Sequence, residues 1–154
     1  MRCDRKNMNH STPNKIADLI KDIIQDKIVC DVGCGDGSFM EAMSKYAKKV
    51  IGVELDEKNV KMVQKRGFSI YHYDSFFVPL DFFNDPPPDV YYLWTRDCMG
   101  VYLKAKYEGT KGTFIFGNSI RPSTKAFLNS LNAEIRSTDI PFGDDVWKVF
   151  ITKL

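Results

Sequence analysis

The stretch Asp31-Val32-Gly33-Cys34-Gly35-Asp36-Gly37 decides the fold of this chain. A short apolar run over residues 27–31 leads into it, and such runs are typical of strands buried on both faces of a parallel sheet. Apolar residues at helical spacing follow it. In open α/β sheets, ligands bind beyond the carboxyl ends of the strands, and glycine there lets the backbone turn sharply and approach a ligand closely. The stretch therefore predicts a ligand-binding loop between a first strand and a helix.

The same alternation of strand and helix patterns continues along the chain. Thr12 is expected to cap the first helix and Pro13 to occupy its first turn. Asp56 is expected to cap the third helix. Proline-rich residues 76–88 predict an irregular connection. We expect helices over residues 12–24, 38–47, 56–66, 96–107 and 122–131, and strands over residues 27–31, 50–54, 68–73, 90–94, 113–116, 135–138 and 146–151.

This order predicts an α/β fold with a doubly wound, mostly parallel seven-stranded sheet and helices on both faces. Long helical crossovers join parallel neighbours, whereas the short turn between the last two strands predicts an antiparallel hairpin at the C-terminal edge. The length of 154 residues suits one domain. We assign that domain to residues 12–154 and interpret residues 1–11 as a mobile N-terminal arm.

Composition excludes several classes of protein. The formal net charge is +2, which gives no strong electrostatic attraction to nucleic acid or membrane. No apolar run approaches the roughly 18 residues of a membrane span. The four cysteines form no CxxC pair, and neither histidine stands near them in a ligand spacing, so no metal site is expected. Reduced thiols favour a cytoplasmic location.

Acidic residues surround the expected ligand site. Glu54 closes the second strand, and Asp74 follows the third. Asp31 and Asp36 flank the glycines, where negative charge would repel the pyrophosphate of a dinucleotide. The third glycine also comes one position earlier than in the G-x-G-x-x-G fingerprint, at Gly37. These features exclude a nicotinamide dinucleotide and favour a cationic ligand such as a sulfonium.

The quoted loop resembles the first motif of class I S-adenosylmethionine-dependent methyltransferases, and Gly52-Val53-Glu54-Leu55-Asp56 resembles their second. The resemblance covers nearly the whole chain, and it implies S-adenosyl-L-methionine as cofactor. By this resemblance, Asp31 engages the cofactor's amino group, Glu54 its ribose, and Asp74 with Ser75 its adenine. The implied cofactor-binding residues are Asp31, Gly33, Cys34, Gly35, Gly37, Glu54, Leu55, Asp74, Ser75 and Trp94.

The catalytic residues stay unassigned. Methyl transfer is an in-line displacement in which the protein mainly aligns the reactants, so a base is needed only to remove a proton from the acceptor. The resemblance places Trp94 and Thr95 beside the transferred methyl, and Asp97 follows them. These three are the candidates for catalysis. Tyr102, Asp144 and His72 have no distinctive setting in the sequence.

The methyl acceptor is the least determined feature. Asn84-Asp85-Pro86-Pro87-Pro88 is similar to the motif of methyltransferases that act on adenine amines, but it precedes the fourth strand instead of following it. We therefore interpret it as a turn and do not expect DNA as the acceptor. The short connections at residues 117–121 and 139–145 predict an open acceptor site, which favours a protein side chain such as lysine.

A weaker resemblance points the same way. The small size, the Thr12-Pro13 opening and a last strand that contains Trp147 are similar to small archaeal-type protein lysine methyltransferases. A small-molecule or RNA acceptor stays open, as does a non-catalytic binding module that keeps the fold. The oligomeric state is not determined by the sequence.

Overall fold

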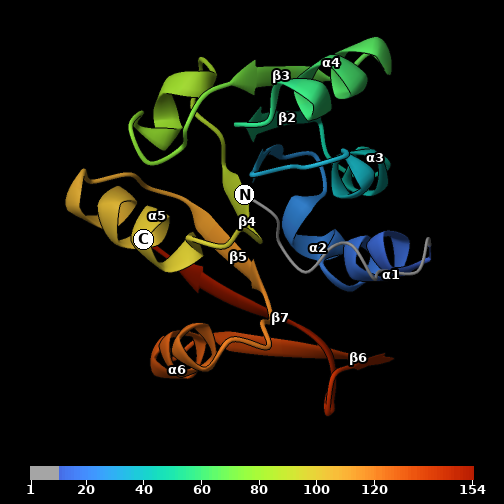
Figure 1. Cartoon of the computed structure of the whole chain (residues 1–154), viewed down its shortest axis with the longest axis vertical. Helices are drawn as coiled ribbons and strands as arrows, with labels where there is room; N and C mark the ends of the chain where they lie inside the picture. The colour runs from blue at the N-terminus through green and yellow to red at the C-terminus, as the bar shows by residue number, and fades with distance from the viewer. Residues whose placement is uncertain (1–10) are drawn as a thin grey trace.

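The computed structural model describes residues 11–154 and contains one seven-stranded sheet with the order β3-β2-β1-β4-β5-β7-β6 (Figure 1). Strands β1 to β5 are parallel, whereas β7 is antiparallel to both β5 and β6. This topology confirms the predicted mostly parallel sheet with a C-terminal hairpin. The strands are β1 (Ile28–Val32), β2 (Lys49–Glu54), β3 (Ser69–His72), β4 (Val90–Leu93), β5 (Thr113–Gly117), β6 (Glu134–Phe142) and β7 (Asp145–Lys153).

Helices cover both faces of the sheet, as Figure 1 shows. One buried apolar cluster joins α1, α3 and α4 to one face, and a second joins η2, α5 and α6 to the other. The helices are α1 (Thr12–Leu19), α2 (Lys21–Ile24), α3 (Ser38–Met43), α4 (Glu57–Lys65), α5 (Cys98–Tyr107) and α6 (Pro122–Ser130), and η2 (Leu80–Phe83) is a 3-10 turn.

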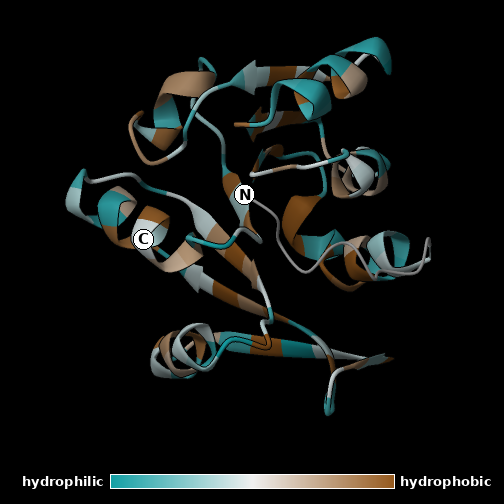
Figure 2. Cartoon of the chain, in the orientation of Figure 1, coloured by the Kyte–Doolittle hydropathy of each residue, from teal (hydrophilic) through white to brown (hydrophobic). Residues whose placement is uncertain are grey.

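Strand burial follows from this layered arrangement. Every residue of β1 and of β4 is buried, because helices cover both faces of the sheet centre. The outermost strand β6 instead alternates exposed and half-buried residues over most of its length. Figure 2 shows the same contrast as apolar central strands and a mixed outer strand. The carboxyl ends of β1 to β5 meet at one edge, where the predicted site residues also lie.

The first helix and the last hairpin differ from the prediction. The expected single helix is split at Ile20, between α1 and α2. Thr12 does not cap it, because Ser11 occupies the cap position and makes no side-chain capping bond. Strand β6 runs through Pro141 to Phe142, past the predicted end at residue 138. A register shift between Ser137 and Pro141 accommodates the proline, which an edge strand tolerates because its missing N–H can face solvent.

The other helices agree more closely. Asp56 caps α4 as predicted, since its side chain accepts a hydrogen bond from the backbone N–H of Lys58. Helix α3 ends at Met43, before Ala47, which was expected to belong to it. The predicted arm over residues 1–11 lies, except for Ser11, outside the described residues. Within residues 11–154, none of the helices combines the length and apolar character that crossing a membrane requires.

The β3–β4 connection is the least regular crossover. It contains only η2, whose Leu80 and Phe83 are 3% and 2% exposed and anchor the segment to the sheet. This agrees with the irregular connection predicted over residues 76–88. Because no α-helix forms within this segment, its remaining aromatic side chains stay largely exposed.

Candidate functional site

The glycine loop turns sharply between β1 and α3. Gly33, Gly35 and Gly37 have φ angles of 72°, 57° and 80°, in the left-handed region that only glycine adopts without strain. The backbone N–H groups of Gly33 and Cys34 both donate to the carbonyl of Val53, at 2.7 and 3.2 Å. The loop is therefore held against the end of β2 before it turns into the helix.

Gly33 also lies against the end of β4. A Cβ at this position would come within 2.2 Å of Cγ2 of Thr95, so no other residue fits without displacing that side chain. Thr95 is itself 8% exposed. The close approach brings together two residues that the sequence assigned to the cofactor and to the methyl-transfer point.

Glu54 fixes the loop through its backbone contacts. The side chain is nearly buried at 4% exposure. Its Oε1 accepts a 2.8 Å bond from the N–H of Gly35, and its Oε2 accepts 2.9 Å bonds from the N–H groups of Leu55 and Asp56. The resemblance implied a ribose ligand at this position but not this structural role. A carboxylate has about four acceptor sites, so these three amides leave about one site for a hydroxyl donor.

The acids of the loop fit a cationic ligand. Asp31 is completely buried within β1, directly before the glycines. A buried carboxylate is stable only when it is paired or hydrogen-bonded. Asp36 is exposed and accepts bonds from the N–H and the hydroxyl of Ser38 at the start of α3. Carboxylates can accept hydrogen bonds from the ammonium group of S-adenosylmethionine and attract its positive sulfur, whereas they repel a pyrophosphate.

The predicted adenine side lies at the neighbouring strand ends. Glu54 pairs with His72 in the β2–β3 register, which brings Leu55 and the residues after β3 together. His72 Nε2 is 2.9 Å from the carbonyl of Leu55. Asp74 and Ser75 are half-buried, and Oδ1 of Asp74 accepts a 3.0 Å bond from the N–H of Phe76. Asp74 therefore shapes the turn in which it stands.

Trp94, at the end of β4, forms a packed wall. It is 2% exposed, and its Nε1 donates a 3.1 Å bond to the carbonyl of Asn118. Its ring meets those of Phe39 and Trp147 edge-on, at centroid distances of 5.1 and 4.7 Å. These contacts join the helix after the glycine loop to the last strand, so Trp94 positions its neighbours as well as bordering the predicted methyl-transfer point.

Asn118 lies at the same edge of the sheet and was not predicted from the sequence. It is 7% exposed at the carboxyl end of β5. Its Nδ2 donates to the carbonyl of Val146, and its Oδ1 accepts from the N–H of Lys148, at 2.9 and 3.3 Å. The side chain thus ties β5 to β7 beside Trp94. The only feature of the sequence that could have indicated Asn118 is its position directly after a parallel strand, where ligands bind in such sheets.

The other catalytic candidates have separate surroundings. Asp97 is exposed, and its N–H donates to Oγ1 of Thr95 at 3.2 Å. Tyr102 is buried among aromatic rings on the face of the sheet that α5 and α6 cover, whereas Trp94 packs on the other face. Asp144 lies in the exposed β6–β7 turn. Burial raises the pKa of the Cys98 thiol to about 11, so it stays protonated at neutral pH. In residues 11–154 no group of three His, Cys, Asp or Glu side chains could hold a metal ion.

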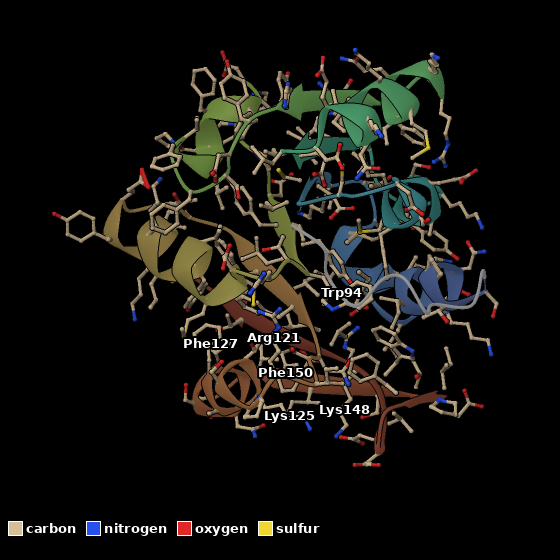
Figure 3. The ribbon with its side chains drawn as sticks, viewed as in Figure 1. Trp94, Arg121, Lys125, Phe127, Lys148 and Phe150 are labelled. Carbon is tan, nitrogen blue, oxygen red and sulfur yellow. The ribbon has the colours of Figure 1, made fainter. Side chains whose placement is uncertain are left out.

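The carboxyl edge of the sheet is acidic although the whole chain is slightly basic. The loops after β1 to β5 and the β6–β7 turn carry more carboxylates than cations: Asp36, Asp56, Asp74, Asp97 and Asp144, against Arg96 and Arg121. One further cation reaches them, since Arg66 at the end of α4 donates a 2.6 Å bond to the carbonyl of Asp36. Figure 3 labels Arg121 and Lys125, at the start of α6, and Lys148 on β7. Lys148 forms an ion pair with Asp145 at 2.7 Å, and its hydrogen bond, more than its charge and that of Lys125, lowers the pKa of Asp145. The negative charge next to β7 and the start of α6 is therefore partly neutralised.

Solved structures of low sequence identity share the fold. The C-terminal domain of precorrin-6Y C5,15-methyltransferase from Rhodobacter capsulatus is 13% identical, with a TM-score of 0.70 over 97% of this chain and 92% of that chain. An rRNA methylase from Streptococcus thermophilus is 14% identical, with a TM-score of 0.63 over 91% and 95%. Magnesium protoporphyrin IX methyltransferase from Synechocystis PCC 6803, with bound SAM, is 15% identical, with a TM-score of 0.64 over 94% and 78%.

The comparison with family models assigns the chain to a protein family. None of the curated proteins matches it. A family model described as a methyltransferase domain matches residues 5–102, which include the glycine loop, Glu54 and the end of β4. Because this match spans more than half of the chain, the chain belongs to the methyltransferase-domain family and is a class I S-adenosylmethionine-dependent methyltransferase.

Proposed function

We propose that this enzyme transfers the methyl group of S-adenosylmethionine to an amine on a protein side chain, with lysine as the best candidate. The observation that carries the proposal is the acidic carboxyl edge of the sheet. An acceptor must approach this edge to reach the end of β4. Exposed carboxylates at such an edge attract a protonated amine and repel the phosphates of a nucleic acid.

The residues of the site support this reaction in three ways. S-adenosylmethionine, when bound, supplies a methyl group that is already activated by its positive sulfur. Asp31 and Glu54 would hold the amino and ribose groups, and the close packing of Gly33 on Thr95 would fix the loop beside the methyl-transfer point. Asp97, exposed next to Thr95, is the carboxylate that we expect to hold the acceptor amine and to accept the proton that it must lose, so that its lone pair can attack the methyl carbon in line.

RNA and small-molecule acceptors have weaker support. The three similar structures are named for different acceptors, namely a precorrin, rRNA and magnesium protoporphyrin IX, so the shared fold does not select among them. Arg121 and Lys125 are exposed beside the site, but Lys148 is paired with Asp145, and the charge of Lys125 also acts on Asp145. Among residues 11–154, this local balance gives no cationic track for a polyphosphate backbone.

A labelling experiment tests the acceptor class. The full chain is incubated with S-adenosylmethionine labelled in its methyl group and with a cell lysate, which is then separated into protein, RNA and small-molecule fractions. We expect label in the protein fraction and methylated lysine after acid hydrolysis. Label confined to RNA or to small molecules would contradict the proposed acceptor, and the variant Glu54→Ala provides the inactive control.

A further inference from the structure

Exposed apolar side chains gather on one part of the molecule. Most of the large apolar side chains that are exposed in residues 11–154 belong to the β3–β4 segment and to α5. Single exposed apolar residues are normal, but a contiguous group marks a binding surface. The group lies on the face of the sheet that η2, α5 and α6 cover, where Figure 1 draws η2 and α5 on the same side.

The β3–β4 half of this surface is aromatic. Tyr73, Phe76, Phe77 and Phe82 are 44%, 47%, 78% and 63% exposed. The rings of Phe76 and Phe77 lie 5.8 Å apart, and those of Tyr73 and Phe82 lie 6.3 Å apart. The exposure has a structural cause, because this crossover contains only a 3-10 turn where the others contain α-helices.

The α5 half is one stripe of a helix. Met99, Leu103 and Tyr107 are 41%, 51% and 92% exposed and follow each other at intervals of four residues, so they share one face. The opposite face of α5 is buried against the sheet, which leaves the helix apolar on both sides. Phe76 joins the two halves, since a Cβ built on Gly100 would lie 3.4 Å from its ring.

The charge of the aromatic half indicates what binds there. Residues 73–89 contain Asp74, Asp81, Asp85 and Asp89 and no lysine or arginine. Asp81 and Asp85 are exposed, and Asp81 directly precedes Phe82 in the chain. Aromatic faces and carboxylates together select cations on an apolar stem, through cation–π contacts and ion pairs.

We propose that the surface formed by Tyr73, Phe76, Phe77, Phe82, Met99, Leu103 and Tyr107 docks a protein segment in which lysine or arginine alternates with apolar residues. On the proposed function, that segment belongs to the methyl acceptor. The surface begins next to Asp74 and Ser75 and continues along α5, which starts directly after Thr95 and Asp97. A segment bound along it would therefore lead toward the methyl-transfer point.

A second copy of the chain fits this surface poorly. Two-fold self-association would place the same patch on both partners and bring the acidic segment against itself. Like charges that face each other across an interface are destabilising. The same acidic charge disfavours single-stranded nucleic acid, which would otherwise stack on exposed rings.

Two synthetic peptides test the proposal on the full chain. One alternates Lys with Leu and carries a fluorescent label, and its twin carries Glu in place of every Lys. We expect the Lys peptide to bind and the Glu peptide not to bind. Phe77→Ser combined with Tyr107→Ser should weaken binding of the Lys peptide about tenfold, as loss of two exposed cation–π or apolar contacts implies. Asp81→Asn combined with Asp85→Asn should weaken it in the same direction.

Ile135→Ser is the matched control, since Ile135 is 53% exposed on β6, outside the surface, and its loss should leave peptide binding unchanged. All variants should bind S-adenosylmethionine like the wild type. The docking surface would be overturned if the two peptides bound equally, or if the double variants bound the Lys peptide as tightly as the wild type. It would also be overturned if the wild type formed a dimer that Phe77→Ser combined with Tyr107→Ser dissociates. Methyl label found only in RNA would instead overturn the proposed acceptor, so the two failures are distinguishable.

Discussion

At the scale of single residues, the site depends on side chains and glycines that hold the backbone. Glu54 accepts hydrogen bonds from the N–H groups of Gly35, Leu55 and Asp56. Gly33 leaves no room for a Cβ beside Thr95. The geometry of the cofactor loop is therefore built into the folded chain, and substitutions at these positions should alter stability together with cofactor binding.

Gly33→Ala should destabilise the fold by about 2–4 kcal/mol, because it combines a strained positive φ with overpacking against Thr95. Urea denaturation measures the free energy of unfolding. Gly67→Ala is the control, since Gly67 also has a positive φ of 85° but nothing within 4 Å of an added Cβ. It should cost only about 1 kcal/mol. Equal losses in the two variants would show that the contact with Thr95 is unimportant.

Glu54→Gln should lower the free energy of unfolding by about 1–3 kcal/mol, because an amide nitrogen replaces one acceptor oxygen and leaves an N–H group unpaired. The affinity for S-adenosylmethionine, measured by calorimetry, should fall with it. Glu57→Gln provides the comparison, since Glu57 forms only an exposed ion pair with Lys61. That change should cost about 0.5 kcal/mol or less. A Glu54→Gln protein as stable as the wild type would refute the backbone role.

At the scale of elements, polar side chains join segments that lie far apart in the sequence. Asn118 bridges the ends of β5 and β7, beside the indole of Trp94. Arg136 on β6 donates to Asp22 on α2 and to the carbonyl of Leu19. These bridges set where the edge hairpin and the first helices sit relative to the central strands.

Asn118→Ala should cost about 1–3 kcal/mol of stability, because it leaves the carbonyl of Val146 and the N–H of Lys148 without this partner in a nearly buried place. We also expect slower methyl transfer, because the backbone carbonyl of residue 118, which accepts the hydrogen bond from Trp94, would be held less firmly. Thermal unfolding and an initial-rate assay measure the two effects. Asn129→Ala, on the exposed side of α6, should change neither; a stable, fully active Asn118→Ala enzyme would exclude the proposed bridge.

The Asp22–Arg136 pair predicts a dependence of stability on pH. The hydrogen bond and charge of Arg136 lower the pKa of Asp22 below its ordinary value of 3.8. A carboxylate whose pKa is lower in the folded state stabilises the fold above its ordinary pKa, and this stabilisation is lost as the pH falls through the lowered value. Because Asp22 is 67% exposed, the contribution is at most about 1 kcal/mol.

Asp22→Asn should therefore be less stable than the wild type at neutral pH and equally stable below the lowered pKa. Denaturation at a series of pH values measures this convergence. Asp139→Asn, an exposed substitution on β6, should show a constant difference from the wild type. A stability gap between Asp22→Asn and the wild type that persists in acid would mean that the ion pair is not its cause.

At the scale of the whole molecule, the sequence predicts the sheet and its order better than it predicts the contacts across it. Buried strands such as β1 and β4 show continuous apolar runs, and the glycines that follow β1 mark the turn, so these features can be read locally. The break at Ile20, the bridge at Asn118 and the backbone bonds of Glu54 depend on partners elsewhere in the chain. No local pattern encodes them.

The same distinction applies to function. The acids around the glycine loop indicate a cationic cofactor from the sequence alone, because they are close together in the chain. The acidic carboxyl edge and the aromatic surface beside it become visible only when the fold brings their loops and α5 together. The proposed acceptor therefore rests more on the folded structure than on any local sequence motif.

Calorimetric titration of S-adenosylmethionine into the full chain tests the central claim most directly, namely that the loop from Asp31 to Gly37 and Glu54 hold this cofactor. We predict saturable binding at one site per chain, weakened in Glu54→Gln and unchanged in Glu57→Gln. NAD should not bind, because the flanking acids repel its pyrophosphate. No binding of S-adenosylmethionine up to its solubility limit, or equal affinity in the wild type and Glu54→Gln, would contradict the account.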